Sequence, residues 1–107
     1  MQERSTAQSQ WQTMTLSEQM GNIGSEVGRA SNWKKRGNEI FCNTARDRAL
    51  ELLDFTASDI RWHGLRKQEI TRVREVLCDF WWGENTYGST TENLEKYFMA
   101  FAVAARK

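Results

Sequence analysis

Residues 20–31 read MGNIGSEVGRAS and place three glycines, Gly21, Gly24 and Gly28, in a stretch whose apolar residues recur at helical spacing. Each glycine inside a helix costs about 0.8–1 kcal/mol relative to alanine, so three of them require a compensating contact. Because they lie three and four residues apart, they share one side of the helix. We therefore expect this side to pack closely against another helix, either within the chain or in a second copy of it.

A phosphate-binding loop is the alternative interpretation of these glycines. Dinucleotide-binding loops need the pattern G-x-G-x-x-G directly after a strand, and P-loops need G-x-x-x-x-G-K-[ST]. Here the spacing is G-x-x-G-x-x-x-G. In addition, Thr15 and Glu18 have the spacing of a capping box, which starts a helix just before the glycines. The pattern therefore favours helix packing over phosphate binding.

The rest of the chain predicts further helices of similar length. Apolar residues repeat with a period of three to four in three more segments, and proline is absent. The segments run over about 38–58, over about 65–82, and from a capping box at Ser89 and Glu92 to about residue 105. Together with the glycine-bearing helix, which we expect to end near Gly37, these segments predict an all-α fold. The expected arrangement is a four-helix up-down-up-down bundle over residues 11–107. Residues 1–10 are polar and aperiodic, and we expect them to form a disordered tail.

Composition gives little indication of a partner. The 15 basic residues nearly balance the 14 acidic ones, so no strong overall field favours nucleic acid or an anionic membrane. The two cysteines, Cys42 and Cys78, lack the spacing of metal ligands, and no apolar segment is long enough to span a membrane. We expect a cytoplasmic protein without a cofactor or a membrane partner.

Catalytic patterns are weak. The single histidine, His63, excludes a di-iron site built from two Glu-x-x-His pairs. Glu51 and Asp54 resemble the E-x-x-D half of the magnesium site in all-α nucleotide pyrophosphohydrolases of the MazG and dUTPase type. The E-x-x-E partner of that site is missing, since Arg29 follows Glu26 at the required position. We predict no enzymatic activity, and a degenerate protein of that type stays as an alternative.

One end of the expected bundle could form a binding surface. In an up-down bundle the first and third connections meet at the same end, which brings basic and aromatic residues together. Cations that meet phosphates beside aromatic rings that stack on bases are typical of single-stranded nucleic-acid binding. The candidate residues are Trp33, Lys34, Lys35, Arg36, Trp81, Trp82 and Tyr87.

Three segments, NIGSEVGRA at 22–30, RALELLD at 48–54 and REVLCDF at 74–80, resemble a group of short bacterial proteins of unknown function. The resemblance covers roughly residues 16–105 and implies a bacterial protein of high helical content, with no catalytic residue to carry over. At the level of fold alone, the chain is similar to small bundles of the ribosomal intervening-sequence and retroelement-accessory kind, which form oligomers and can bind nucleic acid. The sequence thus predicts a non-enzymatic, homo-oligomeric module for protein interaction, with nucleic-acid binding as the alternative.

Overall fold

The computed structural model describes residues 2–106, with side chains described from residue 7 onward. It contains five α-helices: α1 (Gln2–Trp11), α2 (Leu16–Lys35), α3 (Glu39–Ala57), α4 (Leu65–Trp82) and α5 (Thr91–Ala105). No strand occurs among the described residues, which confirms the prediction of an all-α fold. None of these helices is long and apolar enough to cross a membrane.

Helix α1 lies where the sequence analysis predicts a disordered tail, so that prediction is wrong for residues 2–10, and residue 1 lies outside the described part. The end of α1 is attached to the end of α3 by side chains. The indole Nε1 of Trp11 donates to Thr56 Oγ1 at 2.8 Å, and Gln8 Nε2 donates to Ser58 Oγ at 2.8 Å. These contacts are hydrogen bonds between polar side chains. Hydrophobic periodicity does not detect them, so the sequence carries no signal for this helix.

The helix starts follow from local capping. At α2, Thr15 Oγ1 accepts from the Glu18 N–H and Glu18 Oε1 accepts from the Thr15 N–H, which is the reciprocal box that the sequence predicts. Helix α5 begins one residue later than a box on Ser89 would place it, because Thr90 is the cap and accepts from the Asn93 N–H. These caps set the residue at which α2 and α5 begin.

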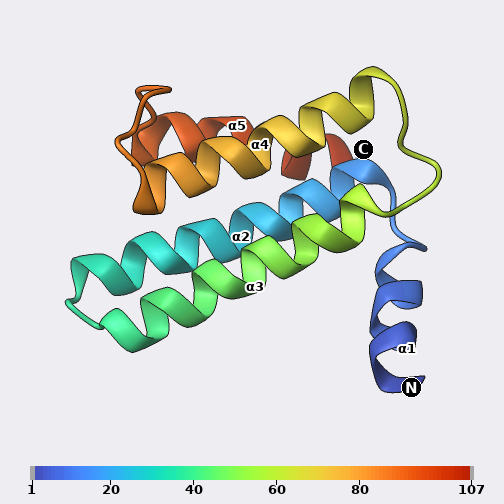
Figure 1. Ribbon diagram of the computed structural model, residues 1–107, viewed down its shortest axis with the longest axis horizontal. Helices are drawn as coiled ribbons and strands as arrows, with labels where there is room; N and C mark the ends of the chain where they lie inside the picture. Colours follow the sequence, from blue (N-terminus) through green and yellow to red (C-terminus); the bar gives the residue numbers. More distant parts are fainter. Residues whose placement is uncertain (1, 107) are drawn as a thin grey trace.

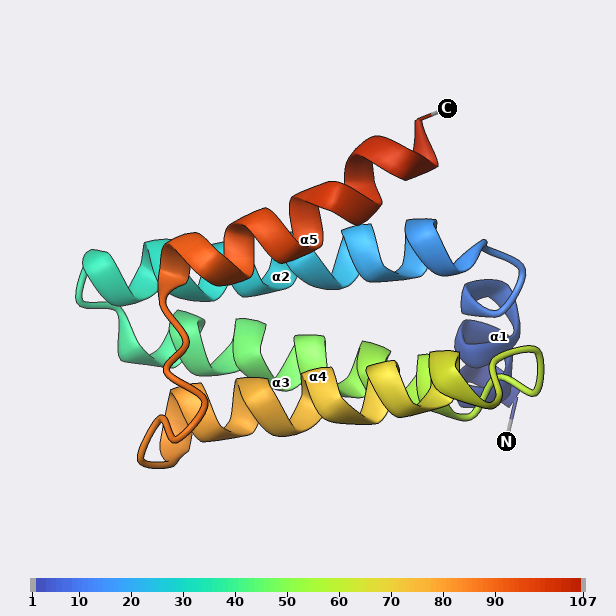
Figure 2. The ribbon, with the colours of Figure 1, turned by 90° about the horizontal axis from the view of Figure 1, so that it is seen from above.

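The four long helices lie side by side and successive ones run in alternating directions (Figure 1). Figure 2 shows α2 and α5 in one layer and α3 and α4 in the other, with the C-terminal end of α5 diverging from α2. Helix α2 packs closely along both α3 and α5, whereas α4 packs against α3 and does not approach α5 closely. Helix α2 is therefore the central element of the fold.

The core is formed by the apolar faces of the helices. Side chains from each of the long helices, and Trp11 at the end of α1, form its main cluster. Its most deeply buried large members are Met20, Ile23, Leu53, Ile70 and Leu77. Beside it, Ala30 of α2 meets Cys42 and Ala45 of α3 in a second cluster of small buried side chains. Small residues thus let α2 approach α3 at this end.

Two of the three glycines lie against α5. A β-carbon at Gly24 would lie 2.4 Å from the Phe98 Cβ, and one at Gly21 would lie 3.2 Å from the Ala102 Cα. Gly28 has no such neighbour within 4 Å. The close contact of α2 with α5 therefore depends on Gly24 above all, since the Phe98 Cβ is fixed to its backbone and cannot turn aside.

A buried group of polar side chains, which we call the polar network, joins α1, α2, α3 and the 58–64 connection. Gln19 is fully buried: its Nε2 donates to the Trp11 carbonyl at 3.0 Å, and its Oε1 accepts from Trp62 Nε1 at 2.9 Å. Asp59 is 3% exposed and pairs with Arg61, whose Nη2 lies 2.6 Å from Asp59 Oδ2. Arg61 also donates to the Met14 carbonyl at 2.7 Å. The network satisfies these polar groups in a place that water does not reach freely.

Replacing Gly24 by alanine tests the close packing of α2 on α5. We expect Gly24→Ala to lower the free energy of unfolding by about 1–3 kcal/mol, because the added methyl group would overpack the contact with Phe98. Gly28→Ala is the matched control and should raise that free energy by up to about 1 kcal/mol, since its site is open and alanine favours helix. Urea titrations of both variants measure this difference. Equal stabilisation by both substitutions would contradict the packing assigned to Gly24.

The ion pair of Asp59 predicts a dependence of stability on pH. Hydrogen bonds from the Arg61 side chain hold the pKa of the Asp59 carboxyl below its usual value, which is about 4. The stabilisation is therefore present above pH about 4 and is lost as the pH falls through the lowered value. Asp59→Asn should cost about 1–3 kcal/mol at neutral pH, and the difference from the wild-type protein should shrink towards low pH. Thermal unfolding at several pH values checks this, and a difference independent of pH would refute it.

Candidate functional site

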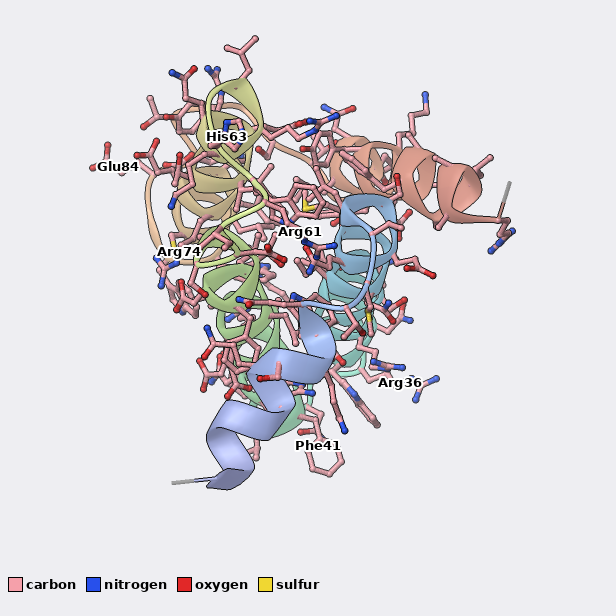
Figure 3. All side chains as sticks on the ribbon, turned by 90° about the vertical axis from the view of Figure 1, so that its right-hand side faces the viewer. Arg36, Phe41, Arg61, His63, Arg74 and Glu84 are labelled. Atoms are coloured by element: carbon pink, nitrogen blue, oxygen red, sulfur yellow. The ribbon has the colours of Figure 1, made fainter. Side chains whose placement is uncertain are left out.

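The end of the molecule at which α2 and α4 end and α3 and α5 begin carries most of the predicted binding residues. Trp33 to Arg36 form the last turn of α2 and its cap, and Trp81 and Trp82 are the last residues of α4. Figure 3 shows Arg36 and Phe41 pointing away from the helices. We call this group, Trp33–Arg36 with Trp81 and Trp82, the basic pole.

Aromatic rings at the basic pole are held by edge contacts and by arginine side chains. Trp33 meets Phe41 of α3 with ring centroids 4.8 Å apart, and the Arg36 guanidinium lies 5.3 Å from the Trp33 ring. Trp81 and Trp82 contact each other edge to face at 5.6 Å. Trp82 is 53% exposed and Phe41 is 50% exposed. Flat aromatic surface and exposed cations are therefore both available to a partner.

Arg46 is the member of this region that the sequence analysis missed. It lies on α3, is only 5% exposed, and has its guanidinium 5.7 Å from the rings of both Trp81 and Trp82. Its Nη1 donates to Asn43 Oδ1 at 3.1 Å, while its Nε has no hydrogen-bond partner within the described part of the chain. An arginine at this depth normally pairs with a carboxylate, and none of the ion pairs between described residues includes Arg46. Helical periodicity alone could not reveal this, because Arg46 is a charged residue beside the buried Ala45.

A partly enclosed cavity of about 260 Å³ opens beside Arg46, where all four long helices contribute side chains. Lys34 and Lys35 line it from α2, Trp81 from α4 and Thr91 from the start of α5. No aspartate or glutamate lines the cavity among the described residues. A cavity bounded by three cationic side chains and no carboxylate favours an anion.

Tyr87 does not join the basic pole. The 83–90 connection folds back along α4, because Asp79 accepts hydrogen bonds from the Thr86 and Tyr87 N–H groups. The Tyr87 ring lies 5.6 Å from the Arg72 guanidinium, and its hydroxyl donates to Glu75 at 3.3 Å. The predicted grouping of Tyr87 with the tryptophans is therefore corrected.

The glycine face and the carboxylate pair occupy other places. Gly21, Gly24 and Gly28 line a shallow groove of about 440 Å³ between α2 and α5, beside Met99. Glu51 and Asp54 are exposed on α3 and pair with Arg48 at 2.8 Å and Arg74 at 2.9 Å. No group of three or more potential metal ligands occurs in the part of the chain that the structure describes.

Comparisons with protein-family models, curated proteins and solved structures gave no match to this chain. We therefore infer function from the geometry of the chain itself. The basic pole, with Arg46 and the cavity beside it, defines a candidate site for an anionic partner.

Arg46 and Arg61 offer a matched test of what a buried arginine does in this fold. We expect Arg46→Met to change the free energy of unfolding by less than about 1 kcal/mol, because removing an unpaired buried charge offsets the lost contacts with two aromatic rings. Arg61→Met should cost about 1–3 kcal/mol, since it leaves the buried Asp59 carboxylate without its partner. Chemical denaturation of both variants measures these effects. A larger loss for Arg46→Met than for Arg61→Met would show that Arg46 is held mainly for stability.

Proposed function

We propose that this chain is a non-enzymatic interaction module whose basic pole binds single-stranded nucleic acid. The observation that carries the proposal is the unpaired Arg46 beside a cavity lined by Lys34 and Lys35, with no carboxylate among the lining residues. Phosphates of a strand would meet these cations and Arg36. Bases would stack on Trp82 and on the Trp33–Phe41 pair, which needs no reading of sequence.

The proposal includes the up-down-up-down bundle as the arrangement that builds the site. With alternating directions, the ends of α2 and α4 and the starts of α3 and α5 fall at one pole (Figures 1 and 2). This supports a surface assembled from four separate segments. A bacterial and cytoplasmic setting, as the resemblance implies, belongs to the same proposal.

Self-association is a second candidate function, and a different observation favours it. Met99, which lines the groove between α2 and α5, is 55% exposed. Val103, one turn further along α5, is 45% exposed. The adjacent glycines present little side chain, so another helix could come close. A homo-oligomer formed by two copies of this face would be isologous. Light scattering coupled to size-exclusion chromatography at several salt concentrations tests self-association. A monomeric mass at every salt concentration would exclude a homo-oligomer.

The nucleotide-hydrolase alternative is not part of the proposal. Glu51 and Asp54 each pair with an arginine, which satisfies their charge at the surface of α3 and α4. A magnesium site would have to displace both arginines before it could use these oxygens. The geometry therefore supports ion pairing for this pair of residues.

Salt dependence and two kinds of variant test the nucleic-acid proposal. Anisotropy of a labelled single strand should show affinity falling steeply between about 50 and 200 mM salt. Lys34→Ala and Lys35→Ala should each weaken binding and reduce the slope of log affinity against log salt by about one. Trp82→Ala should weaken binding through lost stacking, by about 1–3 kcal/mol.

Lys96→Ala is the control for the two lysine variants, because Lys96 is an exposed lysine of α5 that does not line the cavity. It should leave the affinity within about twofold of the wild-type protein. Equal losses for Lys96→Ala and Lys34→Ala would assign binding to net charge and not to the basic pole. Absence of binding at low salt would reject the proposal altogether.

A further inference from the structure

The cavity beside Arg46 differs from the exposed surface of the basic pole because a buried charge forms part of its wall. Arg46 is 5% exposed, and its Nε is without a hydrogen-bond partner among the described residues. The two tryptophan rings and Asn43 Oδ1 account for the other contacts of the guanidinium. The guanidinium carries a positive charge, so this wall of the cavity is cationic. The Arg46 Nε–H therefore remains available to donate a hydrogen bond to a ligand.

The remaining lining groups match an anion that is also a strong hydrogen-bond acceptor. The exposed Lys34 and Lys35 add two ammonium groups to the lining, and Ser31 and Thr91 add hydroxyl donors. The nearest acidic residues in sequence, Asp47 on α3 and Glu92 on α5, are exposed and do not line the cavity. Three positive charges against no lining carboxylate favour a dianion over a monoanion, because the Coulomb attraction scales with the charge of the ligand.

Helix α5 contributes its N-terminal end to the same cavity. Thr91, the first residue of this 15-residue helix, lines the wall. The Thr90 side chain satisfies the Asn93 N–H, which leaves the earlier N–H groups of the first turn for another acceptor. The positive end of the helix dipole adds to the field of the three side chains. The buried Arg46 and this helix start are independent features that favour the same kind of ligand.

We propose that the cavity binds a phosphate monoester dianion, and that in the bound complex this group is the terminal phosphate of a nucleic-acid strand. An end group has one ester arm, which can leave the cavity on the side of the exposed Lys34 and Lys35. An internal phosphodiester carries one negative charge and would need room for two arms. The inference rests on the proposed function, because it takes the strand on the basic pole as the source of the phosphate.

Matched oligonucleotides of one sequence, with a 5′-phosphate, a 3′-phosphate or hydroxyls at both ends, test this inference on the full chain. We expect one of the phosphorylated strands to bind about tenfold or more tightly than the hydroxyl strand, as charge-assisted hydrogen bonds to a buried donor allow. Inorganic phosphate should compete for that extra affinity and not for the rest. Arg46→Met should abolish the preference, and Arg46→Lys should restore part of it.

Two further variants keep the result clear of folding effects. Lys34→Ala with Lys35→Ala changes only exposed side chains and should also reduce the preference. Arg48→Met is the control, because Arg48 is an exposed arginine two residues from Arg46 that pairs with Glu51 outside the cavity. The preference should be unchanged in that variant.

The outcomes separate this inference from the proposed function. Equal affinity of the wild-type protein for all three strands would overturn the phosphate cavity and leave strand binding by the basic pole in place. Loss of the preference in Arg48→Met to the same degree as in Arg46→Met would also overturn the cavity, since net charge would then explain it. A wild-type protein that binds none of the strands would reject the proposed function, and the inference with it.

Discussion

The approach of α2 to α5 at Gly24 is the contact on which the arrangement of the other helices depends. A side chain there would collide with the Phe98 Cβ at 2.4 Å, so the two helices can lie this close only where the β-carbon is missing. Helix α5 packs against α2 and does not approach α4 closely. The space between α4 and α5 is lined by apolar residues such as Val73 and Leu94 and is bridged by the Tyr97 hydroxyl, which donates to Glu69 at 2.7 Å. Burial, with a further contribution from Glu69, raises the pKa of Tyr97 well above its usual range, so this bridge keeps its proton.

The two ends of the helical fold differ in how their buried charges are paired. At the polar network, the buried Asp59 carboxylate has a bidentate arginine partner and a further donor in Gln19. At the basic pole, Arg46 is as deeply buried and has only an amide oxygen and two aromatic rings. Burial of an unpaired charge is unfavourable unless something compensates it. The same fold gives the buried Asp59 a full set of hydrogen-bond partners. This contrast supports a ligand as the missing partner of Arg46.

The sequence alone was sufficient for the all-α class, for the limits of four helices to within a few residues and for a close-packed role of the Gly21 and Gly24 side of α2. Each of these follows from a local signal: apolar spacing, a capping box or a run of small residues. Helix α1 could not be predicted in this way, because Gln8 and Trp11 are ordered by hydrogen bonds to residues some 45 to 50 positions away. For a similar reason, Arg46 was missed and Tyr87 was assigned to the wrong group. The environment of Arg46 comes from α4, and Tyr87 is turned back along α4 by Asp79.

Tryptophans occur both at the polar network and at the basic pole, and their environments differ between the two. At the polar network, Trp11 and Trp62 donate their indole N–H groups to Thr56 and Gln19. These two tryptophans therefore have a structural role, with their hydrogen-bond donors satisfied. Trp33, Trp81 and Trp82 make no indole hydrogen bond to the residues the structure describes, and their rings face arginine side chains instead. A tryptophan with a free donor and a cation on its face is suited to a partner that offers both an acceptor and a flat ring. A nucleotide offers both, since its phosphate oxygens can accept from the indole or the arginine while its base stacks on an exposed ring such as Trp82.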